Sequence, residues 1–277
     1  MEFGEFEIFI LSDGEMRLDG GAMFGVVPKV LWEKKAPADE KNRIRLGLNS
    51  LLIKTGRKNI LIDTGCGGKY STKEREIYGL SRTDQLLAAL RDLGLQPGDI
   101  DVVVNTHYHF DHCGGNTREV DGRVRASFPE AEYVVQQKEF EEATKPHERN
   151  QASYLNENWE ALLKSGQLSL IDGEVEISPG VTCIPTPGHT LGHQSVIVES
   201  QDKCLLYLGD LCPTRAHIPL AWIMAYDLYP RMTLETRRQV YEVALRNQWL
   251  LFFEHDPDHP FGLLDYSEGR YRIRRES

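Results

Sequence analysis

Ligand-type side chains crowd one short stretch of the chain, and this stretch constrains the fold more than any other feature of the sequence. Residues 107 to 112 follow the pattern His-x-His-x-Asp-His, two residues after the run Ile100–Val104, which is apolar except for Asp101. Such a run is typical of a buried strand, and functional groups are often found where a strand passes into a loop. Imidazole and carboxylate groups at this density repel one another or lose hydration unless a cation binds them. The stretch therefore predicts a metal site at the carboxyl end of a buried strand.

Three further candidate ligands occupy equivalent positions in the predicted fold. Each follows an apolar run: His189 after Val181–Ile184, Asp210 after Leu205–Leu208 and His255 after Trp249–Phe253. Bound molecules and ions commonly lie outside the carboxyl ends of the strands in a sheet. We therefore expect these three side chains to converge on one rim of the fold, next to His107, His109, Asp111 and His112.

The order of apolar runs and amphipathic segments predicts the fold class. Strands are predicted at Glu5–Leu11, Arg43–Thr55, Asn59–Ile62, Ile100–Val104, Glu132–Val135, Leu168–Ile171, Val181–Ile184, Ser195–Glu199, Leu205–Leu208 and Trp249–Phe253. Helices are predicted at Thr83–Leu93 with Thr83 as N-cap, Lys138–Thr144, Tyr154–Lys164 and Thr233–Asn247. Strand clusters alternate with single helices, which favours an α/β (α+β) fold: an αββα sandwich of two packed mixed sheets with helices outside, in a single domain over residues 1–277.

The segment Gly20–Trp32 reads as a loop that is too apolar to be fully solvated. Two interpretations stay open for it. It packs on the core, or it lines a substrate cleft.

Composition excludes several classes of protein. The chain has 32 Lys and Arg against 42 Asp and Glu, a net charge of −10 that would repel the phosphate backbone of a nucleic acid. No apolar stretch approaches the roughly 20 residues that cross a bilayer, and the acidic amino terminus differs from a signal peptide. The five cysteines form no Cys-x-x-Cys pair, which suits free thiols in a reducing compartment. We expect a cytoplasmic protein with no nucleic-acid or membrane partner.

The motif His107-x-His109-x-Asp111-His112, with the downstream ligands and the turn Asp63-Thr64-Gly65, resembles the metallo-β-lactamase superfamily of hydrolases. The resemblance covers nearly the whole chain and includes the sandwich fold. It implies one metal held by His107, His109 and His189, a second held by Asp111, His112 and His255, and Asp210 bridging both.

The resemblance also implies two divalent metal ions and a hydroxide between them as the nucleophile. Zinc is the expected metal because it suits three neutral imidazoles, and manganese, iron or cobalt would also suit the carboxylate-containing second site. Asp111 would have a second, catalytic role in carrying a proton to the leaving group. Asp63 would accept the ring N–H of a ligand histidine, or else it merely closes a turn.

Within the superfamily the sequence is most similar to the branch that includes the quorum-quenching N-acyl homoserine lactonases. The similarity lies in the apolar loop Asp19–Gly25, in Pro187-Gly188-His189-Thr190 and in Phe253–Asp256. It implies hydrolysis of an ester bond in a small-molecule lactone or ester. Lactonases of this type carry a tyrosine three residues after the bridging aspartate, whereas this chain has Pro213.

This departure leaves two interpretations. Another residue after Asp210 takes the role of the missing tyrosine, and His217, Tyr226 and Tyr229 are the candidates. Alternatively the substrate differs, and the protein is a phosphotriesterase or arylesterase of the same fold.

Other members of the superfamily fit less well. A thioester hydrolase of the glyoxalase II type would add a helical domain, but only 22 residues follow His255. A nuclease would need a basic groove, and a flavodiiron protein would replace His109 with glutamate. A non-catalytic metal-binding scaffold is disfavoured by the complete ligand set. The apolar amino-terminal loop and the aromatic residues make a homodimer a reasonable expectation.

Overall fold

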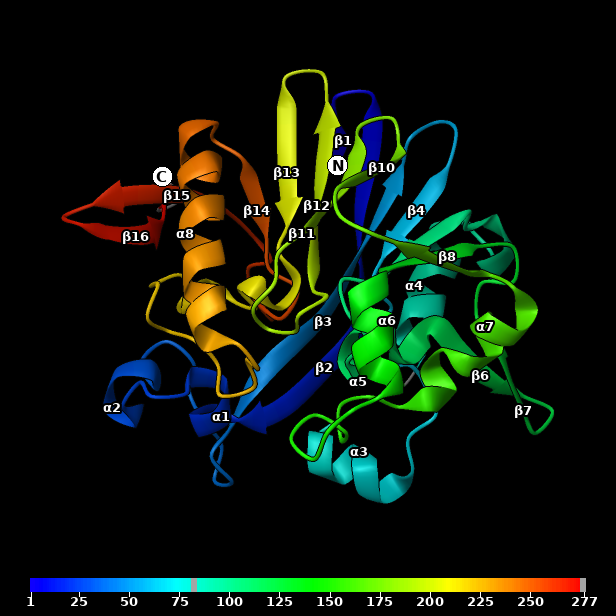
Figure 1. Cartoon of the computed structure of the whole chain (residues 1–277), viewed down its shortest axis with the longest axis horizontal. Helices are drawn as coiled ribbons and strands as arrows, with labels where there is room; N and C mark the ends of the chain where they lie inside the picture. Colours follow the sequence, from blue (N-terminus) through cyan, green and yellow to red (C-terminus); the bar gives the residue numbers. More distant parts are fainter. Residues whose placement is uncertain (81–83, 275–277) are drawn as a thin grey trace.

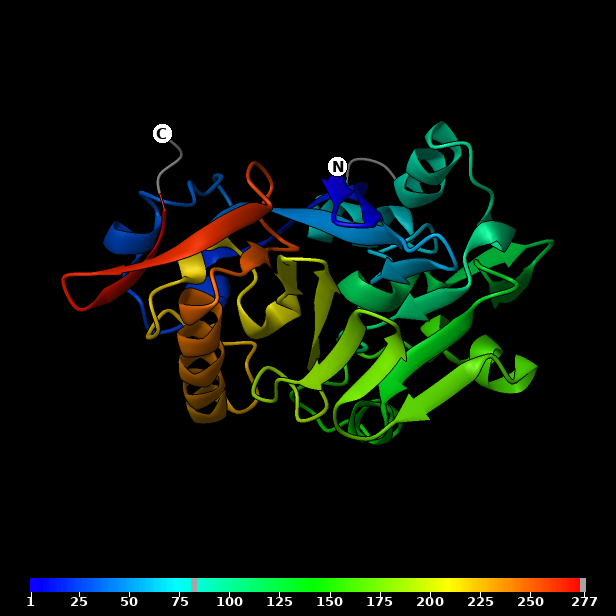
Figure 2. The same ribbon diagram turned by 90° about the horizontal axis from the view of Figure 1, so that it is seen from above.

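Two mixed β-sheets pack face to face and helices cover their outer surfaces, which confirms the predicted αββα sandwich (Figure 1). The computed structural model describes residues 1–80 and 84–274. Seen from above, helices α4 and α8 lie on opposite outer sides of the two layers (Figure 2). This agrees with their contacts, since α4 packs on β2 of one sheet and α8 on β15 of the other.

Each predicted strand overlaps an observed one. The first sheet has the order β1 (Glu2–Phe3), β2 (Phe6–Asp19), β3 (Arg43–Lys54), β4 (Asn59–Ile62), β5 (Val102–Val104), β8 (Glu132–Gln136) and β9 (Leu168–Ile171). The second has the order β10 (Val175–Ser178), β11 (Val181–Pro185), β12 (Gln194–Ser200), β13 (Lys203–Tyr207), β14 (Leu250–Phe252), β15 (Phe261–Ser267) and β16 (Arg270–Ile273). A separate hairpin joins β6 (Thr117–Val120) to β7 (Arg123–Ala126). Neighbours from β4 to β9 are parallel, as are β13 and β14, so their carboxyl ends share a rim.

The helices of the described residues are mostly short. The α-helices are α1 (Gly20–Phe24), α2 (Lys29–Trp32), α3 (Thr72–Tyr78), α4 (Gln85–Asp92), α5 (Phe110–Cys113), α6 (Gln137–Thr144), α7 (Glu160–Ser165) and α8 (Pro230–Arg246). The 3-10 turns are Pro97–Asp99, Gly114–Asn116, Asn156–Asn158, Gly209–Leu211 and Arg215–His217. Within the described ranges, no helix has the length and apolar character needed to cross a membrane.

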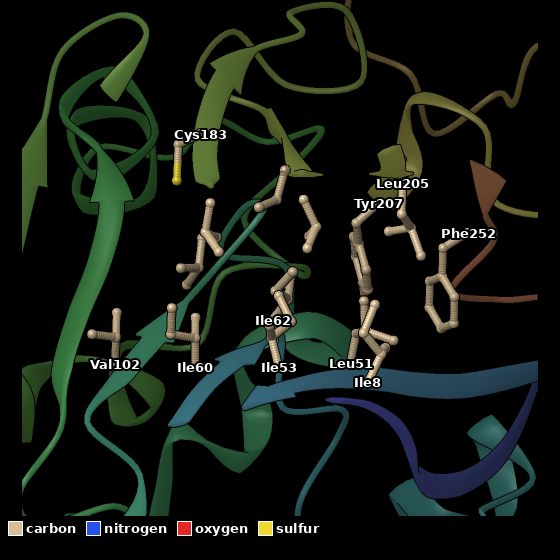
Figure 3. Packing of buried hydrophobic residues seen from close by; sticks show 14 of the residues in the cluster. Ile8, Leu51, Ile53, Ile60, Ile62, Val102, Cys183, Leu205, Tyr207 and Phe252 are labelled. Atoms are coloured by element: carbon tan, nitrogen blue, oxygen red, sulfur yellow. The ribbon is translucent and has the colours of Figure 1, made fainter. Parts of the chain in front are cut away.

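The main core lies between the sheets. Figure 3 shows Ile53 and Ile62 of the first sheet pointing toward the layer that carries Tyr207 and Phe252. These four side chains are fully buried. Burying a large apolar side chain stabilises the fold by about 1.5–3 kcal/mol, so the alternating apolar residues of facing strands hold the layers together. The rim that carries the candidate ligands is therefore supported by a buried apolar core.

The amino-terminal strand is longer than predicted. The predicted strand ends at Leu11, before the turn-type pair Asp13-Gly14, but β2 continues to Asp19 and pairs with β3 on both sides of that pair. The register shifts between Ser12 and Glu15, and Gly14 has a φ of 98°. A β-bulge therefore absorbs the turn signal without ending the strand.

Two helix predictions need correction. The helix predicted at Thr83–Leu93 is α4, which begins at Gln85, and the proposed N-cap Thr83 lies outside the described residues. The prediction at Tyr154–Lys164 is wrong in its first half, where a 3-10 turn precedes α7. Trp159 separates the two with a φ of −137° and packs its ring edge-on against Phe140 at 5.2 Å. Burial of this indole interrupts the helix.

The segment Gly20–Trp32 forms the short helices α1 and α2 rather than a loop. The Asp19 carboxylate caps α1 by accepting a hydrogen bond from the amide of Ala22 at 2.8 Å. The core-packing interpretation is confirmed for part of this segment. Phe24 and Trp32 are buried in a core cluster, whereas Met23 also lines the cavity described below.

Candidate metal centre

The fold brings the seven predicted ligands to one rim. His107 and His109 follow β5, and α5 begins at Phe110, which places Asp111 and His112 in its first turn. The other three follow strands of the second sheet: His189 after β11, Asp210 after β13 and His255 after β14. The sandwich therefore assembles the site from both of its layers.

One group of ligand atoms lies around His189. Its Nε2 is 3.0 Å from Nδ1 of His109 and 3.2 Å from Oδ2 of Asp210. The ring of His107 stands edge-on to that of His109, with centroids 4.5 Å apart. The buried Nε2 of His107 has no hydrogen-bond partner among the described residues. His107, His109 and His189 thus present three nitrogens to one point.

A second group lies around His255. Its Nε2 is 3.1 Å from Nε2 of His112, 3.6 Å from Oδ2 of Asp111 and 3.3 Å from Oδ1 of Asp210. The two oxygens of Asp210 therefore face different groups, Oδ2 toward His189 and Oδ1 toward His112 and His255. This is the position that a bridging carboxylate needs.

The donor set fits divalent metal ions. Ligands bound to zinc at about 2.0–2.1 Å in a tetrahedron lie about 3.3 Å apart, close to the separations seen here. Burial lowers the pKa of His107 and His109 well below 6.5, so both rings are neutral and offer lone pairs. Burial opposes the charged forms of His189 and His255 too, but Asp210 raises the pKa of both rings, that of His255 to about 9, so a bound metal ion would displace a proton from each. Neutral imidazoles suit zinc, and the added carboxylates also suit manganese, iron or cobalt.

Outer contacts orient the ligand histidines. Nδ1 of His189 donates to Oδ1 of Asp227 at 2.8 Å, and Nδ1 of His255 donates to the carbonyl of Gly47 at 2.8 Å. Nδ1 of His107 lies 3.0 Å from the Thr106 hydroxyl. These contacts leave Nε2 of each ring free for a metal.

Asp63 is buried beside His112 and Thr106. It accepts hydrogen bonds from the amide of Thr106 at 2.8 Å and from the Thr106 hydroxyl at 2.6 Å, and Nδ1 of His112 is 3.2 Å away. Sequence reasoning missed two other buried acids that contact ligand histidines, Asp227 beside His189 and Glu254 beside His112. Asp227 stands in no motif, whereas Glu254 could have been noticed from its place directly before His255.

His217, one of the candidates for substrate contact, packs inside the protein instead. Its Nδ1 lies 2.8 Å from the Thr214 hydroxyl, its Nε2 lies 2.9 Å from the carbonyl of Met23, and its ring stacks on Phe24 at 4.4 Å. Burial lowers its pKa to about 3, so the ring is neutral. With both nitrogens engaged, His217 secures α1 and offers no free atom to a substrate, which corrects the expectation from sequence.

A cavity of about 420 Å³ opens beside the ligands. Its apolar wall includes Met16, Met23, Leu46, Met224 and Leu228, and its polar wall includes Asp111, Arg149, Asp210 and Tyr226. Burial raises the pKa of Tyr226 to about 12, so its hydroxyl keeps a proton to donate. Tyr229 is not among the lining residues, so Tyr226 is the better placed of the two tyrosines.

Comparison with known proteins identifies the family. The model of the metallo-beta-lactamase superfamily matches residues 44–255. An N-acyl homoserine lactonase from Bacillus cereus is 27% identical over 242 residues, which cover 82% of this chain and 88% of that protein.

Solved structures give the same result. A probable metal-dependent hydrolase from Staphylococcus aureus is 34% identical, with a TM-score of 0.90 and full coverage of both chains. An N-acyl homoserine lactone hydrolase, with the product N-hexanoyl-L-homoserine bound at its catalytic metal centre, is 25% identical. Its TM-score is 0.71, and the match covers 91% of this chain and 93% of that one.

Proposed function

The chain belongs to the metallo-β-lactamase superfamily, and from that premise we propose that it is a dinuclear metal-dependent hydrolase of lactones or related esters. The observation that carries this proposal is the position of Asp210. One of its oxygens faces His189 and the other faces His112 and His255. A single carboxylate shared by two groups of ligands is what a two-metal hydrolytic site requires.

The cavity supports a substrate with a small polar head and an apolar tail. Its ligand-bearing end would take the scissile carbonyl, and the wall of Met16, Met23, Met224 and Leu228 would take an acyl chain. Methionine side chains are flexible and adapt to irregular apolar shapes. Relatives named N-acyl homoserine lactonases make an acyl homoserine lactone the first substrate to test.

Two divalent ions, when bound, would supply Lewis acidity and a water of lowered pKa. The chain's own residues would bind and orient the substrate and move protons. Tyr226 would donate a hydrogen bond to a substrate oxygen from the cavity wall. Asp111, which reaches both the cavity and His255, would pass a proton to the departing alkoxide.

Pro213 supports a second substrate class. It stands where lactonases of this branch carry a tyrosine, and its carbonyl accepts a hydrogen bond from the amide of His255 at 3.0 Å. A site without that tyrosine would depend less on recognising the amide group of an N-acyl homoserine lactone. Aryl esters and phosphotriesters are therefore the alternatives.

The test is hydrolysis followed in a pH-stat with protein of measured metal content. Acyl homoserine lactones of several chain lengths, simple aryl esters, phosphotriesters and thioesters form the panel. We expect lactones with apolar chains to give the highest kcat/KM, and the Tyr226→Phe variant to lose part of it. The matched control is Tyr266→Phe, whose side chain is exposed on β15. Fully metal-loaded protein without turnover on any substrate of the panel would refute the proposal.

A further inference from the structure

Two buried carboxylates face one ring nitrogen beneath the metal centre. Nδ1 of His112 lies 2.9 Å from Oε2 of Glu254 and 3.2 Å from Oδ2 of Asp63. The contact with Asp63 meets strict hydrogen-bond geometry, whereas the shorter contact with Glu254 does not. All three residues are fully buried. A neutral imidazole that binds a metal through Nε2 has a single N–H, at Nδ1. Only one of the two acids can be its main acceptor.

Asp63 already has other donors. Its oxygens accept the amide N–H and the hydroxyl of Thr106, at 2.8 and 2.6 Å. Because that hydroxyl donates to Asp63, it must accept from the neighbouring Nδ1 of His107, 3.0 Å away. Asp63 therefore supports His107 through Thr106.

Glu254 has no such donors. Neither of its carboxylate oxygens forms a hydrogen bond that meets strict geometry within the described residues. The phenol of Tyr207 is also close, but it donates to the carbonyl of Asn49 at 3.1 Å. The Glu254 backbone is fixed, since its carbonyl accepts from the side-chain amide of Asn49 at 2.8 Å. A buried carboxylate without a donor costs several kcal/mol. Nδ1 of His112, 2.9 Å from Oε2, is within hydrogen-bonding distance of Glu254, and a turn of the carboxylate or of the ring would align the two groups.

We propose that Glu254, rather than Asp63, accepts the ring proton of His112 and is the positioning residue for the metal held by Asp111, His112 and His255. Asp63 then serves the other metal through Thr106 and His107. The assignment rests on the two-metal centre of the proposed function. It gives each metal its own buried acid behind the ligand histidines. A carboxylate that accepts the ring N–H of a ligand histidine raises the basicity of that histidine and fixes its orientation.

The experiment measures metal binding, not turnover. Zinc affinity is determined by chelator competition for the wild type and for Glu254→Leu, Glu254→Gln and Asp63→Asn. Glu132→Gln, an exposed acid on β8, is the matched control. Cobalt loading followed by visible absorption reports the coordination of each site, and thermal unfolding of the metal-free proteins reports folding.

We expect Glu254→Leu to weaken one of the two zinc sites about 10–100-fold and to change the cobalt spectrum of that site. Glu254→Gln keeps an acceptor but loses the charge. Its zinc affinity should lie between that of Glu254→Leu and that of the wild type. The metal-free Leu variant should be at least as stable as the wild type, because it removes a buried acid without a donor. Asp63→Asn should weaken the other site.

Three outcomes would overturn the assignment. Glu254→Leu could bind two zinc ions with wild-type affinity, or Asp63→Asn could be the variant that alters the site of His112. A third zinc ion per chain would show that Asp63, His112 and Glu254 form a metal site of their own. Each outcome is independent of the substrate, so failure of the lactonase proposal alone would leave the assignment standing.

Discussion

Arg237 lies on α8, fully buried, and forms no ion pair with a carboxylate in the described part of the chain. Its guanidinium instead donates to backbone carbonyls of the segment that follows Asp210. The acceptors are Leu211, His217 at 3.1 Å and Trp222 at 2.8 Å. We expect Arg237→Met to destabilise this segment and with it the wall of the cavity.

The expected magnitude follows from these three hydrogen bonds. Each buried carbonyl that loses its donor costs about 1–3 kcal/mol. Part of this loss is recovered because methionine removes an unpaired buried charge, whose desolvation costs several kcal/mol. The net decrease in the free energy of unfolding should be about 2–4 kcal/mol.

Urea unfolding followed by tryptophan fluorescence measures the effect, since Trp222 lies on the affected segment. The matched control is Arg238→Met, the next residue on α8, which is exposed and should stay within about 0.5 kcal/mol of the wild type. In the folded variant KM should rise more than kcat falls, because Met224 and Tyr226 of the cavity wall follow Trp222. Equal stability of the Arg237 and Arg238 variants would refute the reasoning.

Three further predictions concern the metal centre and its surroundings. Asp210→Ala should lose about two to four orders of magnitude in hydrolytic rate together with bound metal; near-normal activity would exclude a two-metal mechanism. Exhaustive chelation should abolish turnover and lower the Tm, and both should return on adding zinc; activity that persists in metal-free protein would contradict this. Burial raises the pKa of Glu139 to about 7, above the 4.5 of the unfolded chain, so the folded protein favours its neutral form. The free energy of unfolding should therefore fall by up to about 3 kcal/mol as pH rises through this window, and Glu139→Gln should flatten that slope in urea titrations.

The candidate ligands could be found from sequence because four of them lie within six residues and the other three follow apolar strands. Ligand-type side chains next to apolar strands indicate a metal site without any knowledge of distant contacts. The strands were predictable for the same reason, since buried runs such as Val102–Val104 leave few alternatives. Residues whose role depends on a distant contact could not be found this way: Asp227 meets His189 across 38 positions, and Arg237 meets Leu211 across 26.

Errors arose where tertiary contacts outweighed local signals. Asp13-Gly14 reads as a turn, yet pairing with β3 carries the strand past it. His217 follows a metal ligand closely in sequence, which suggested contact with substrate, but its ring turns inward toward Met23 and Phe24. The hairpin β15–β16 was not predicted, because its alternation of half-buried residues is weak.

The ligands come from both layers of the sandwich, four after β5 and three after strands of the second sheet. Cations held there would cross-link the two layers at one edge, in addition to the apolar contacts between them. Scarcity of metal in the cell would then loosen the same edge that admits substrate. Protein made under metal starvation should be cut by proteases at this edge first, so that metal supply would govern how long the protein persists as well as how fast it works.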